Sequence, residues 1–520
     1  MRRVAVLGAG ISGLAAALTL ARENEIEVVV YEASDRAGGV LETIYDGPYL
    51  IERSADNFAT LIPDALTLCQ DHGLASELIS PEATNRQAFV LNRGRLLPIP
   101  AGFSLMQPTR VRPILQTRTL SWMAKLRLLG EFWVPPRTSD EDESLEAFAV
   151  RRLGREAFEN LVEPIVSGIF TADPATLSMR ATMPQFVEME RKAGGLIRGH
   201  LANRKQDAVA AARRASGARY DQFVAPRSGM SSLVRALAEQ LPSGALRLST
   251  PVKSLGLESR LPGVSQSGGS QSGGLQIDDL QSGDIHTGGE QRWRIETAGE
   301  TELFDAVICA TPAATTAGLL TAAAPAAAAI VGSIPYASSA VVALVVERAE
   351  LTGRVDGFGL IVPHKEGRQT LAISYTSNKY PGRVPEEQML LRIFLGGAQR
   401  AQLLDRSDQE LLHLATQELR EILGWHGKVP RWQAVIRWRE AMPQYLVGHV
   451  ERMRELEQAL APFPTLKLCG AGYAGVGIPQ CVRGGKKVAQ EVLAQFAKAN
   501  VAGSQHYTAS PRPPEPENFG

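Results

Sequence analysis

The sequence predicts an α/β protein with a Rossmann-like domain, and three observations support this. A β-branched strand at 4–7 leads into the turn Gly8-Ala9-Gly10-Ile11-Ser12-Gly13, and an apolar, alanine-rich helix follows over 14–21. A second β-branched run at 28–31 ends at Glu32, 19 residues beyond Gly13. This is the βαβ dinucleotide-binding fingerprint, in which a strand, a glycine turn, a helix, a second strand and an acidic residue follow in this order.

Each glycine of the turn has a physical role. Gly8 allows the tight turn, Gly10 lets the backbone approach a pyrophosphate, and Gly13 lets the helix pack closely on the strand. Free N–H groups at the start of the helix bind phosphate charge. The residues predicted to line the phosphate site are therefore Gly8, Ala9, Gly10, Ile11, Ser12 and Gly13.

The acid at Glu32 indicates which dinucleotide binds. A carboxylate at this distance accepts hydrogen bonds from ribose hydroxyls, which argues against a 2′-phosphate and so against NADP. A rival interpretation of the same stretch is a secretory signal or a membrane span, because Met1-Arg2-Arg3 precedes eighteen uncharged residues. The three glycines at motif spacing and the charged turn at 23–25 fit neither segment well.

Composition narrows the class of protein. The 520 residues are enough for two or three domains, and 55 basic residues balance 55 acidic ones, which gives no support for a nucleic-acid partner. Beyond the N-terminus no stretch is apolar enough to span a bilayer. The cysteines at 69, 309, 469 and 481 are widely spaced without a CxxC pair. They predict neither a metal site nor a disulfide framework, and favour the cytoplasm.

The segment after Glu32 specifies the cofactor further. Its pattern E-x-x-x-R-x-G-G resembles the extension found in the FAD-dependent amine oxidase and porphyrinogen oxidase superfamily, although Val40 stands where an Arg often follows the paired glycines. The resemblance implies FAD, and an ordinary polar turn is the alternative. It adds four residues to the predicted cofactor site, with Arg36 meeting phosphate: Ala33, Arg36, Gly38 and Gly39.

Three longer blocks resemble a narrower group, the HemY-type protoporphyrinogen and coproporphyrinogen oxidases. They are Tyr49–Phe58, Phe158–Ser178 and Trp438–His449, the last matching W-x-x-x-x-P-Q-Y-x-x-G-H. The second block predicts a helix broken at Pro164 and Gly168, and a strand is predicted over 246–252. The resemblance implies a six-electron oxidation of a porphyrinogen to a porphyrin in three flavin reductions, with oxygen as acceptor and release of hydrogen peroxide. It leaves open whether coproporphyrinogen III or protoporphyrinogen IX is preferred. No catalytic side chain is predicted, because the flavin carries the chemistry.

Five residues are predicted to bind substrate. Asp56 and Asn57 either face the flavin and the substrate pyrroles or cap the following helix, predicted over 63–72. A P-x-P-x-G turn ends at Gly102, and Ser104 stands where some relatives place a propionate-binding Arg. The carboxylate anchor is therefore expected from the neighbouring arginines, which are Arg95, Arg110 and Arg112.

The C-terminal part completes the predicted flavin site. Its glycines let the backbone lie against the isoalloxazine, and the last helix, predicted over 480–496, points its N-terminus at the reduced flavin. By resemblance, Val252 pairs with the adenine and Trp438 packs near the flavin, whereas His449 is more often structural than catalytic in such blocks. The predicted contacts here are Val252, Trp438, Gly472, Val476, Gly477 and Ile478.

The FAD-binding domain is predicted to be assembled from discontinuous segments, with an inserted mixed-sheet substrate domain and a mostly helical domain. A Gln/Ser/Gly tract with a near-repeat interrupts the second segment and should form a mobile loop. The FAD-binding domain is predicted to consist of residues 1–80, 221–315 and 431–498, with an insertion at 259–291. Residues 81–220 are predicted to form a substrate and helical domain that possibly faces the membrane, and 316–430 the sheet of the substrate domain. Residues 499–520 are predicted to be a disordered tail.

Several alternatives stay open at this point. An amine oxidase on the same fold, a carotenoid desaturase and a non-catalytic FAD-binding interaction protein share the N-terminal fingerprint. Residues 187–219 hold eight basic residues against three acids, which indicates either a solvated face or a contact with anionic lipid or a partner enzyme. We further expect a transient contact with a ferrochelatase, a peripheral contact with the inner face of the membrane, and a homodimer.

Overall fold

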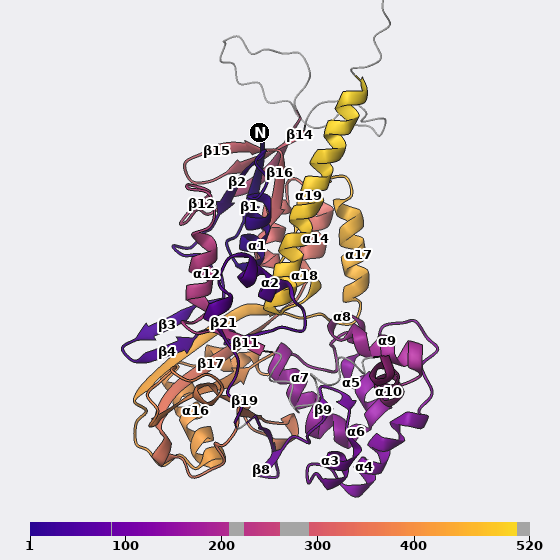
Figure 1. Cartoon of the computed structure of the whole chain (residues 1–520), viewed down its shortest axis with the longest axis vertical. Coiled ribbons are helices and arrows are strands. Elements are labelled where there is room, and N and C mark those ends of the chain that lie inside the picture. Colours follow the sequence, from indigo (N-terminus) through magenta and orange to yellow (C-terminus); the bar gives the residue numbers. More distant parts are fainter. Residues whose placement is uncertain (85, 207–222, 260–290, 507–520) are drawn as a thin grey trace, which may run out of the picture.

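A parallel sheet of widely separated segments forms the centre of the Rossmann-like part (Figure 1). The structure, a computed structural model, describes residues 1–84, 86–206, 223–259 and 291–506, and within these ranges the sheet has the order β12-β2-β1-β16-β22. Since β2 and β16 flank β1, the strand order reverses there, and a ligand crevice is expected at the carboxyl end of β1. The strands are β1 (Arg2–Leu7), β2 (Ile26–Tyr31), β12 (Leu246–Arg247), β16 (Ala306–Cys309) and β22 (Leu466–Leu468).

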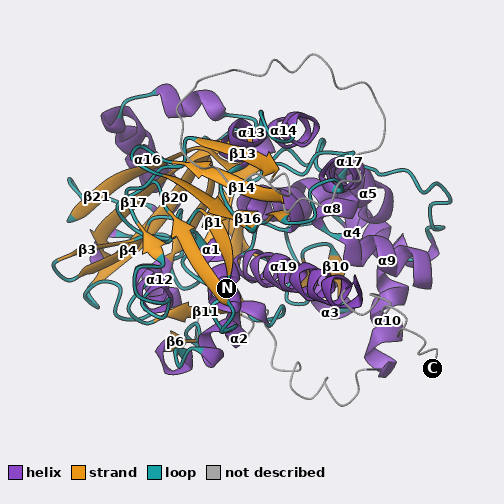
Figure 2. Ribbon diagram, turned by 90° about the horizontal axis from the view of Figure 1, so that it is seen from above, coloured by secondary structure: helices purple, strands orange, loops and turns teal. Residues whose placement is uncertain are grey.

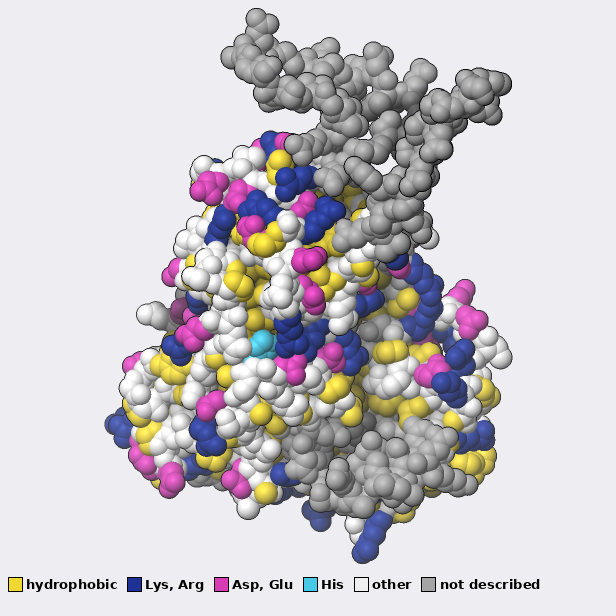
Figure 3. All heavy atoms as spheres, turned by 45° about the horizontal axis from the view of Figure 1, so that its top comes forward, with side chains coloured by type: hydrophobic (Ala, Val, Ile, Leu, Met, Phe, Trp, Pro, Cys, Tyr) yellow, Lys and Arg dark blue, Asp and Glu magenta, His cyan; other side chains and the backbone are white. Residues whose placement is uncertain are grey.

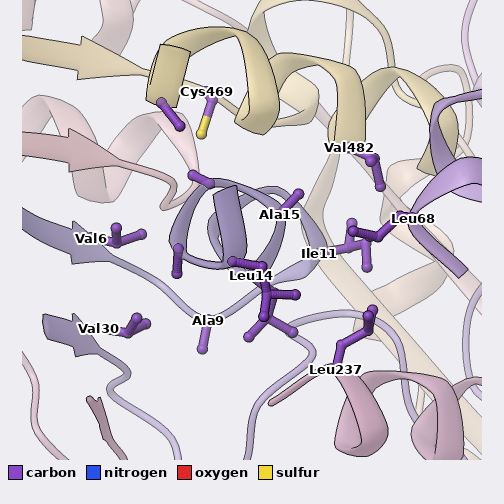
Figure 4. Packing of buried hydrophobic residues seen from close by; sticks show 14 of the residues in the cluster. Val6, Ala9, Ile11, Leu14, Ala15, Val30, Leu68, Leu237, Cys469 and Val482 are labelled. Atoms are coloured by element: carbon purple, nitrogen blue, oxygen red, sulfur yellow. The ribbon is translucent and has the colours of Figure 1, made fainter. Parts of the chain in front are cut away.

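Both faces of this sheet are buried, because alternate residues of each strand point to opposite sides. Val4, Val6 and Val30 pack against α1 and α19, whereas Ala5 and Val29 pack toward α13 and α14 (Figures 2 and 4). The helices on the first face are α1 (Ile11–Leu20), α2 (Asp64–Asp71), α12 (Met230–Ala238) and α19 (Ile478–His506). Those on the other are α13 (Ala313–Leu320), α14 (Pro325–Gly332) and α17 (His449–Leu460).

A mixed sheet forms the second part, with the order β21-β17-β20-β19-β18-β7-β8 among the described residues. Its neighbours are antiparallel except for β18 and β7. The helix α16 (Asp408–Leu423) covers one face and begins with a capping box of Ser407 and Glu410. The strands are β7 (Ala88–Asn92), β8 (Arg95–Pro98), β17 (Tyr336–Glu347), β18 (Gly359–Ile361), β19 (Thr370–Tyr375), β20 (Gln388–Gly396) and β21 (Trp432–Pro443).

A helical part lies beside the mixed sheet (Figure 1) and has its own apolar core. At its centre the fully buried Arg152 donates to the equally buried Glu131, whose carboxylate also accepts from the N–H of Leu196 at the start of α10. The helices are α3 (Val111–Gln116), α4 (Trp122–Leu129), α5 (Leu145–Leu153), α6 (Arg155–Ala157), the π-helical η3 (Phe158–Val162), α7 (Glu163–Phe170), α8 (Met179–Thr182), α9 (Pro184–Ala193) and α10 (Leu196–Gln206).

Short elements connect these parts. The strands are β3 (Thr43–Asp46), β4 (Tyr49–Glu52), β5 (Phe58–Ala59), β6 (Leu78–Ile79), β9 (Phe103–Ser104), β10 (Gln107–Pro108), β11 (Phe223–Pro226), β13 (Ser254–Ser259), β14 (Gln291–Glu296) and β15 (Thr301–Phe304). The helices are α15 (Thr376–Lys379) and α18 (Ala471–Ala474). Single 3₁₀ turns are η1 (Ala75–Glu77), η2 (Gly130–Trp133), η5 (Arg348–Glu350), η6 (His364–Glu366) and η7 (Ala401–Asp405).

The predicted α/β class is confirmed, and several predicted boundaries are wrong. The helix α7 runs through Gly168, where a break was expected, because a helical glycine costs only about 1 kcal/mol. The strand expected over 246–252 pairs only at β12, and α19 continues to His506, past the expected start of a tail at 499. Most of the predicted insertion at 259–291 lies outside the described residues. The division into domains stays a prediction, although β21 places 432–443 in the mixed sheet.

The surface is mixed in charge. On the face seen in Figure 3, Lys and Arg side chains alternate with Asp and Glu side chains, in agreement with the zero net charge. Within the described ranges, none of the helices combines the length and the apolarity that a membrane crossing requires.

Candidate functional site

The glycine turn between β1 and α1 has the geometry that a pyrophosphate needs. Gly8 has a φ of +100°, and a Cβ on Gly13 would lie 1.9 Å from the Gly8 carbonyl oxygen, so the helix crosses too closely for any side chain. A Cβ on Gly10 would instead meet nothing within 4 Å, and no side chain caps the N-terminus of α1. This open space above an uncapped helix start fits the phosphates of a dinucleotide.

Glu32 holds the turn from the end of β2. Its Oε2 accepts from the Ala9 N–H at 2.7 Å, and its Oε1 accepts from the Ser34 N–H at 2.9 Å. A carboxylate has room for further hydrogen bonds. The predicted contact with ribose hydroxyls therefore stays a prediction and is compatible with the contacts that Glu32 already makes.

The loop after Glu32 lies against the glycine turn. Gly38 and Gly10 form an isolated parallel bridge, and a Cβ on Gly39 would lie 3.5 Å from the Gly10 Cα. Arg36 donates to the carbonyls of Ala37, Gly39 and Leu41, and it pairs with Glu42 at 3.0 Å. In this structure Arg36 therefore shapes the loop, and its predicted phosphate contact stays a prediction, as does any cofactor contact of the adjacent Ala33.

A second glycine turn, between β22 and α19, lies on the other side of β1. Tyr445 holds it, since its hydroxyl donates to the Ala471 carbonyl and accepts from the Gly475 N–H at 2.7 Å. The turn contains Gly472 and Gly475, which has a φ of +129°, and it leads through Val476 and Gly477 into Ile478, the first residue of α19. The turn therefore consists of backbone next to a helix N-terminus, and the predicted contacts of its residues with the flavin ring stay a prediction.

The block around Tyr445 acts as a scaffold. Tyr445 stacks on His449 with ring centroids 4.3 Å apart, and the His449 Nε2 donates to the Tyr473 carbonyl at 3.1 Å. Burial lowers the pKa of His449, so the ring is neutral near pH 7. Gln444 donates to the Phe170 carbonyl at 3.2 Å and thereby joins the end of β21 to α7. The structural interpretation of His449 is the one that these contacts support.

Asp56 lies between β4 and β5 and contacts residues of α15 and of the mixed sheet. Its carboxylate accepts from the Asn57 side chain at 2.7 Å and lies 3.5 Å from both Lys379 and Arg392. Burial alone would raise the pKa of Asp56, but the two cations outweigh burial and hold it below its ordinary value. Asp56 is therefore a fixed anion, and α2 begins behind Pro63 without a side-chain cap, so the capping alternative is wrong.

The segment before Asp56 is attached to the same sheet. Arg392 donates to the Ser54 carbonyl, and the Trp438 Nε1 donates to the Arg53 carbonyl at 3.0 Å. The Ser54 hydroxyl donates to the Val40 carbonyl at 2.6 Å, next to the paired glycines. Trp438 and Asp56 thus lie near the predicted flavin loop, whereas sequence reasoning missed Lys379 and Arg392 because no motif surrounds them.

An apolar row crosses the face of the mixed sheet opposite α16. Ile361, Ala372 and Phe394 occupy one register across β18, β19 and β20, and all three are only half-buried. Gly168 of α7 faces this row, since its Cβ would lie 4.0 Å from Ile361 Cγ2. Half-buried apolar residues between a helix and a sheet suit a flat apolar ligand.

The remaining predicted residues are further from this row. Val252 is half-buried against the core on the α13 side of the parallel sheet, where the predicted adenine contact stays a prediction. Arg95, at the start of β8, and Arg110 and Arg112, at the start of α3, are all exposed. Their role as carboxylate anchors likewise stays a prediction.

Comparison with known proteins places the chain in a family. Residues 11–493 match the family described as flavin containing amine oxidoreductase. Coproporphyrinogen III oxidase of Bacillus subtilis is 32% identical over 498 residues, which cover 95% of this chain and 98% of that protein. Protoporphyrinogen oxidase 1 of the spinach chloroplast is 29% identical over 94% of this chain and 84% of its own length.

Solved structures agree with the fold. A crystal structure from Exiguobacterium sp. 255-15, assigned provisionally as a protoporphyrinogen oxidase, superposes with a TM-score of 0.76 at 27% identity, covering 95% of this chain and 99% of that one. Cyclohexylamine oxidase from Brevibacterium oxydans has a TM-score of 0.65 at 16% identity over 95% of this chain and 99% of its own, which shows the fold alone. The family match confirms the predicted flavin cofactor, and the chain belongs to the flavin-containing amine oxidoreductases.

Proposed function

We propose that the protein is a porphyrinogen oxidase of haem biosynthesis. It would remove six electrons from coproporphyrinogen III, or from protoporphyrinogen IX, in three two-electron steps. The observation that carries the proposal is the similarity to the Bacillus enzyme along nearly the whole of both chains. The apolar row beside α7 supports it, because a porphyrinogen is a flat, largely apolar macrocycle.

The protein's own residues bind and orient the macrocycle. FAD, held by the glycine turns at 8–13 and 472–478, would supply the two-electron oxidation of a meso carbon, with oxygen as the final acceptor and hydrogen peroxide as its product. Loss of hydride leaves positive charge on the macrocycle, and a pyrrole N–H then releases a proton. Asp56, kept anionic by Lys379 and Arg392, offsets part of the charge of these two cations, and Asn57 orients its carboxylate.

Turnover with measured peroxide tests this function. Under anaerobic conditions, coproporphyrinogen III or protoporphyrinogen IX should bleach the flavin, and in air each porphyrin formed should be accompanied by three molecules of hydrogen peroxide. The substrate that reduces the flavin faster is the preferred one. If neither porphyrinogen bleaches the flavin while a simple amine does, the protein is an amine oxidase. If no reductant of either class acts, the non-catalytic alternative holds.

We also propose that the enzyme lies in the cytoplasm and touches the membrane at its helical part. Three large side chains on one face of α4 are exposed, Trp122 by 67%, Met123 by 83% and Leu126 by 67%. Trp133 of η2 is 74% exposed, and the Lys125 ammonium lies 4.5 Å from the centre of the Trp122 ring. Exposed tryptophans beside other exposed apolar side chains suit the headgroup region of a bilayer, whereas Lys125 itself is buried and donates to the Leu115 carbonyl.

Mutation of this patch is expected to weaken binding to vesicles without reducing turnover. The double variant Trp122→Ser, Met123→Ser should lose most of its sedimentation with phosphatidylglycerol vesicles, because it loses most of the exposed apolar area. A matched control is Leu61→Ser, since Leu61 is 70% exposed in another part of the fold. Equal sedimentation of both variants with the wild type would contradict the assignment, as would resistance of the natural association to high salt and carbonate.

Three further proposals concern partners. Oxygen is the electron acceptor, a ferrochelatase receives the product in a transient complex, and two copies of the chain form a homodimer. These proposals rest on the resemblance described above. Analytical ultracentrifugation of the holoenzyme, alone and with the ferrochelatase, separates the last two.

A further inference from the structure

A small cavity lies where α7 meets the ends of β18 and β20. Its enclosed volume is only about 10 Å³, room for about one water molecule, so a ligand group would meet the lining side chains at the open mouth. Glu163, Ser167 and Thr171 line it from the side of α7, and His364 and Arg400 line it from the side of the mixed sheet. It is separate from the glycine turns and from Asp56, and no part of the function described so far uses it.

Arg400 is a cation without a contacting anion. One of its terminal nitrogens donates to the His364 Nδ1 at 3.3 Å, and the other donates to the Arg368 carbonyl. Among the described residues no carboxylate oxygen forms an ion pair with it, and partial burial lowers its pKa. A partly desolvated guanidinium of this kind favours a planar, bidentate anion such as a carboxylate.

Glu163 supplies an acid on the opposite wall. Its carboxyl oxygens accept from the Ser167 hydroxyl at 3.2 Å and from the His364 N–H at 3.1 Å. Burial raises its pKa to about 7, with Arg400 opposing and Asp173 reinforcing the shift. The protonated form of Glu163 can donate to an incoming carboxylate, whereas the ionised form repels it.

The position of the cavity relates it to the apolar row. Arg392, beside Asp56, and Gly396, in the cavity wall, lie four residues apart on β20, a span of about 13 Å at 3.3 Å per residue. Phe394 of the apolar row lies between them on the same face of the strand. This length suits a tetrapyrrole whose oxidised edge lies near Asp56 and whose propionate arm points toward Arg400.

We propose that this cavity is a carboxylate subsite, in which Arg400 pairs with one propionate of the substrate and protonated Glu163 donates a hydrogen bond to it. The inference rests on the proposed function, since it assumes a porphyrinogen in the apolar row. Arg95, Arg110 and Arg112 are then free to meet the remaining propionates from outside. The subsite makes binding stronger at lower pH.

Binding of the product coproporphyrin III to the holoenzyme tests the subsite without turnover. Arg400→Gln should raise the Kd about tenfold or more, which is about 1.4 kcal/mol per decade, and Arg400→Lys should have an intermediate effect. The matched control Arg454→Gln removes an arginine of α17 whose side chain is 65% exposed, and it should leave the Kd unchanged. Each variant is first checked for wild-type flavin content and melting temperature.

The pH dependence of binding provides a second test, in which Glu163→Gln keeps the size of the side chain. The wild-type Kd should rise between pH 6 and pH 8 as Glu163 loses its proton, whereas Glu163→Gln should remove this rise. If wild type binds coproporphyrin III but neither Arg400→Gln nor Glu163→Gln alters its Kd or pH dependence, the subsite is wrong and the proposed function stands. If wild type binds no porphyrin, both are wrong.

Discussion

Replacing Gly10 by valine is expected to give a folded protein that purifies without flavin. The backbone at Gly10 has φ −66° and ψ 173°, which valine adopts readily, and a Cβ there meets no protein atom within 4 Å. The side chain would instead fill the space above the uncapped start of α1, where the phosphates must lie. We expect FAD affinity to fall at least about 100-fold, or roughly 3 kcal/mol, measured by titration of the apoprotein.

Two control variants show that this loss is specific. Gly318 also has no atom within 4 Å of an added Cβ, but it is exposed on α13, on the other face of the parallel sheet, so Gly318→Val should bind FAD normally. Gly13→Ala should destabilise the apoprotein itself, because its Cβ would lie 1.9 Å from the Gly8 oxygen. A yellow Gly10→Val protein with full FAD occupancy would contradict the assignment of the turn.

Replacing Arg152 by methionine is expected to destabilise the helical part by about 3–5 kcal/mol. The Arg152 side chain is completely buried and donates its Nε to Glu131 at 2.8 Å. Without Arg152, the Glu131 carboxylate remains buried and loses the cation with which it pairs. Chemical denaturation followed by tryptophan fluorescence measures the loss, since Trp122 and Trp133 belong to this part of the chain.

The control for Arg152 is an exposed ion pair in the same region. Arg155 pairs with Glu146 and its side chain is 58% exposed, so Arg155→Met should cost less than about 1 kcal/mol. The double variant Arg152→Met, Glu131→Gln should be more stable than the sum of its single changes, because it no longer buries an unpaired charge. Equal stability of Arg152→Met and Arg155→Met would show that the buried pair is replaceable.

Sequence reasoning predicted the glycine turn well because its geometry is local. The spacing of Gly8, Gly10 and Gly13 sets the turn and the helix start, and the structure has both where the pattern places them. Helix ends were predicted less well. The break expected at Gly168 is absent, since tertiary contacts of α7 with the mixed sheet outweigh the weak helix propensity of one glycine.

The environment of the predicted substrate-binding residues depended on contacts between segments that are distant in the sequence. Asp56 was a candidate from its motif, but its charge state follows from Lys379 and Arg392, more than 300 residues further along the chain. Arg95, Arg110 and Arg112 were chosen because they lie near a turn in the sequence, and the structure leaves all three exposed. Arg400 and Glu163 had no recognisable spacing, because they meet only where α7 packs beside β20.

By itself, the sequence determined the phosphate turn, the flavin class and the order of the family blocks, because each depends on residues within a few turns of chain. Only the tertiary structure decided which charges are buried together, which face of the mixed sheet stays open beside α7, and where a cation has no anion partner among the described residues. Burial and pairing arise from segments that the chain brings together across hundreds of residues. Asp56 and Glu163 are both carboxyls, yet the pKa of Asp56 is lowered and that of Glu163 is raised. Only their neighbours in the folded chain account for the opposite directions.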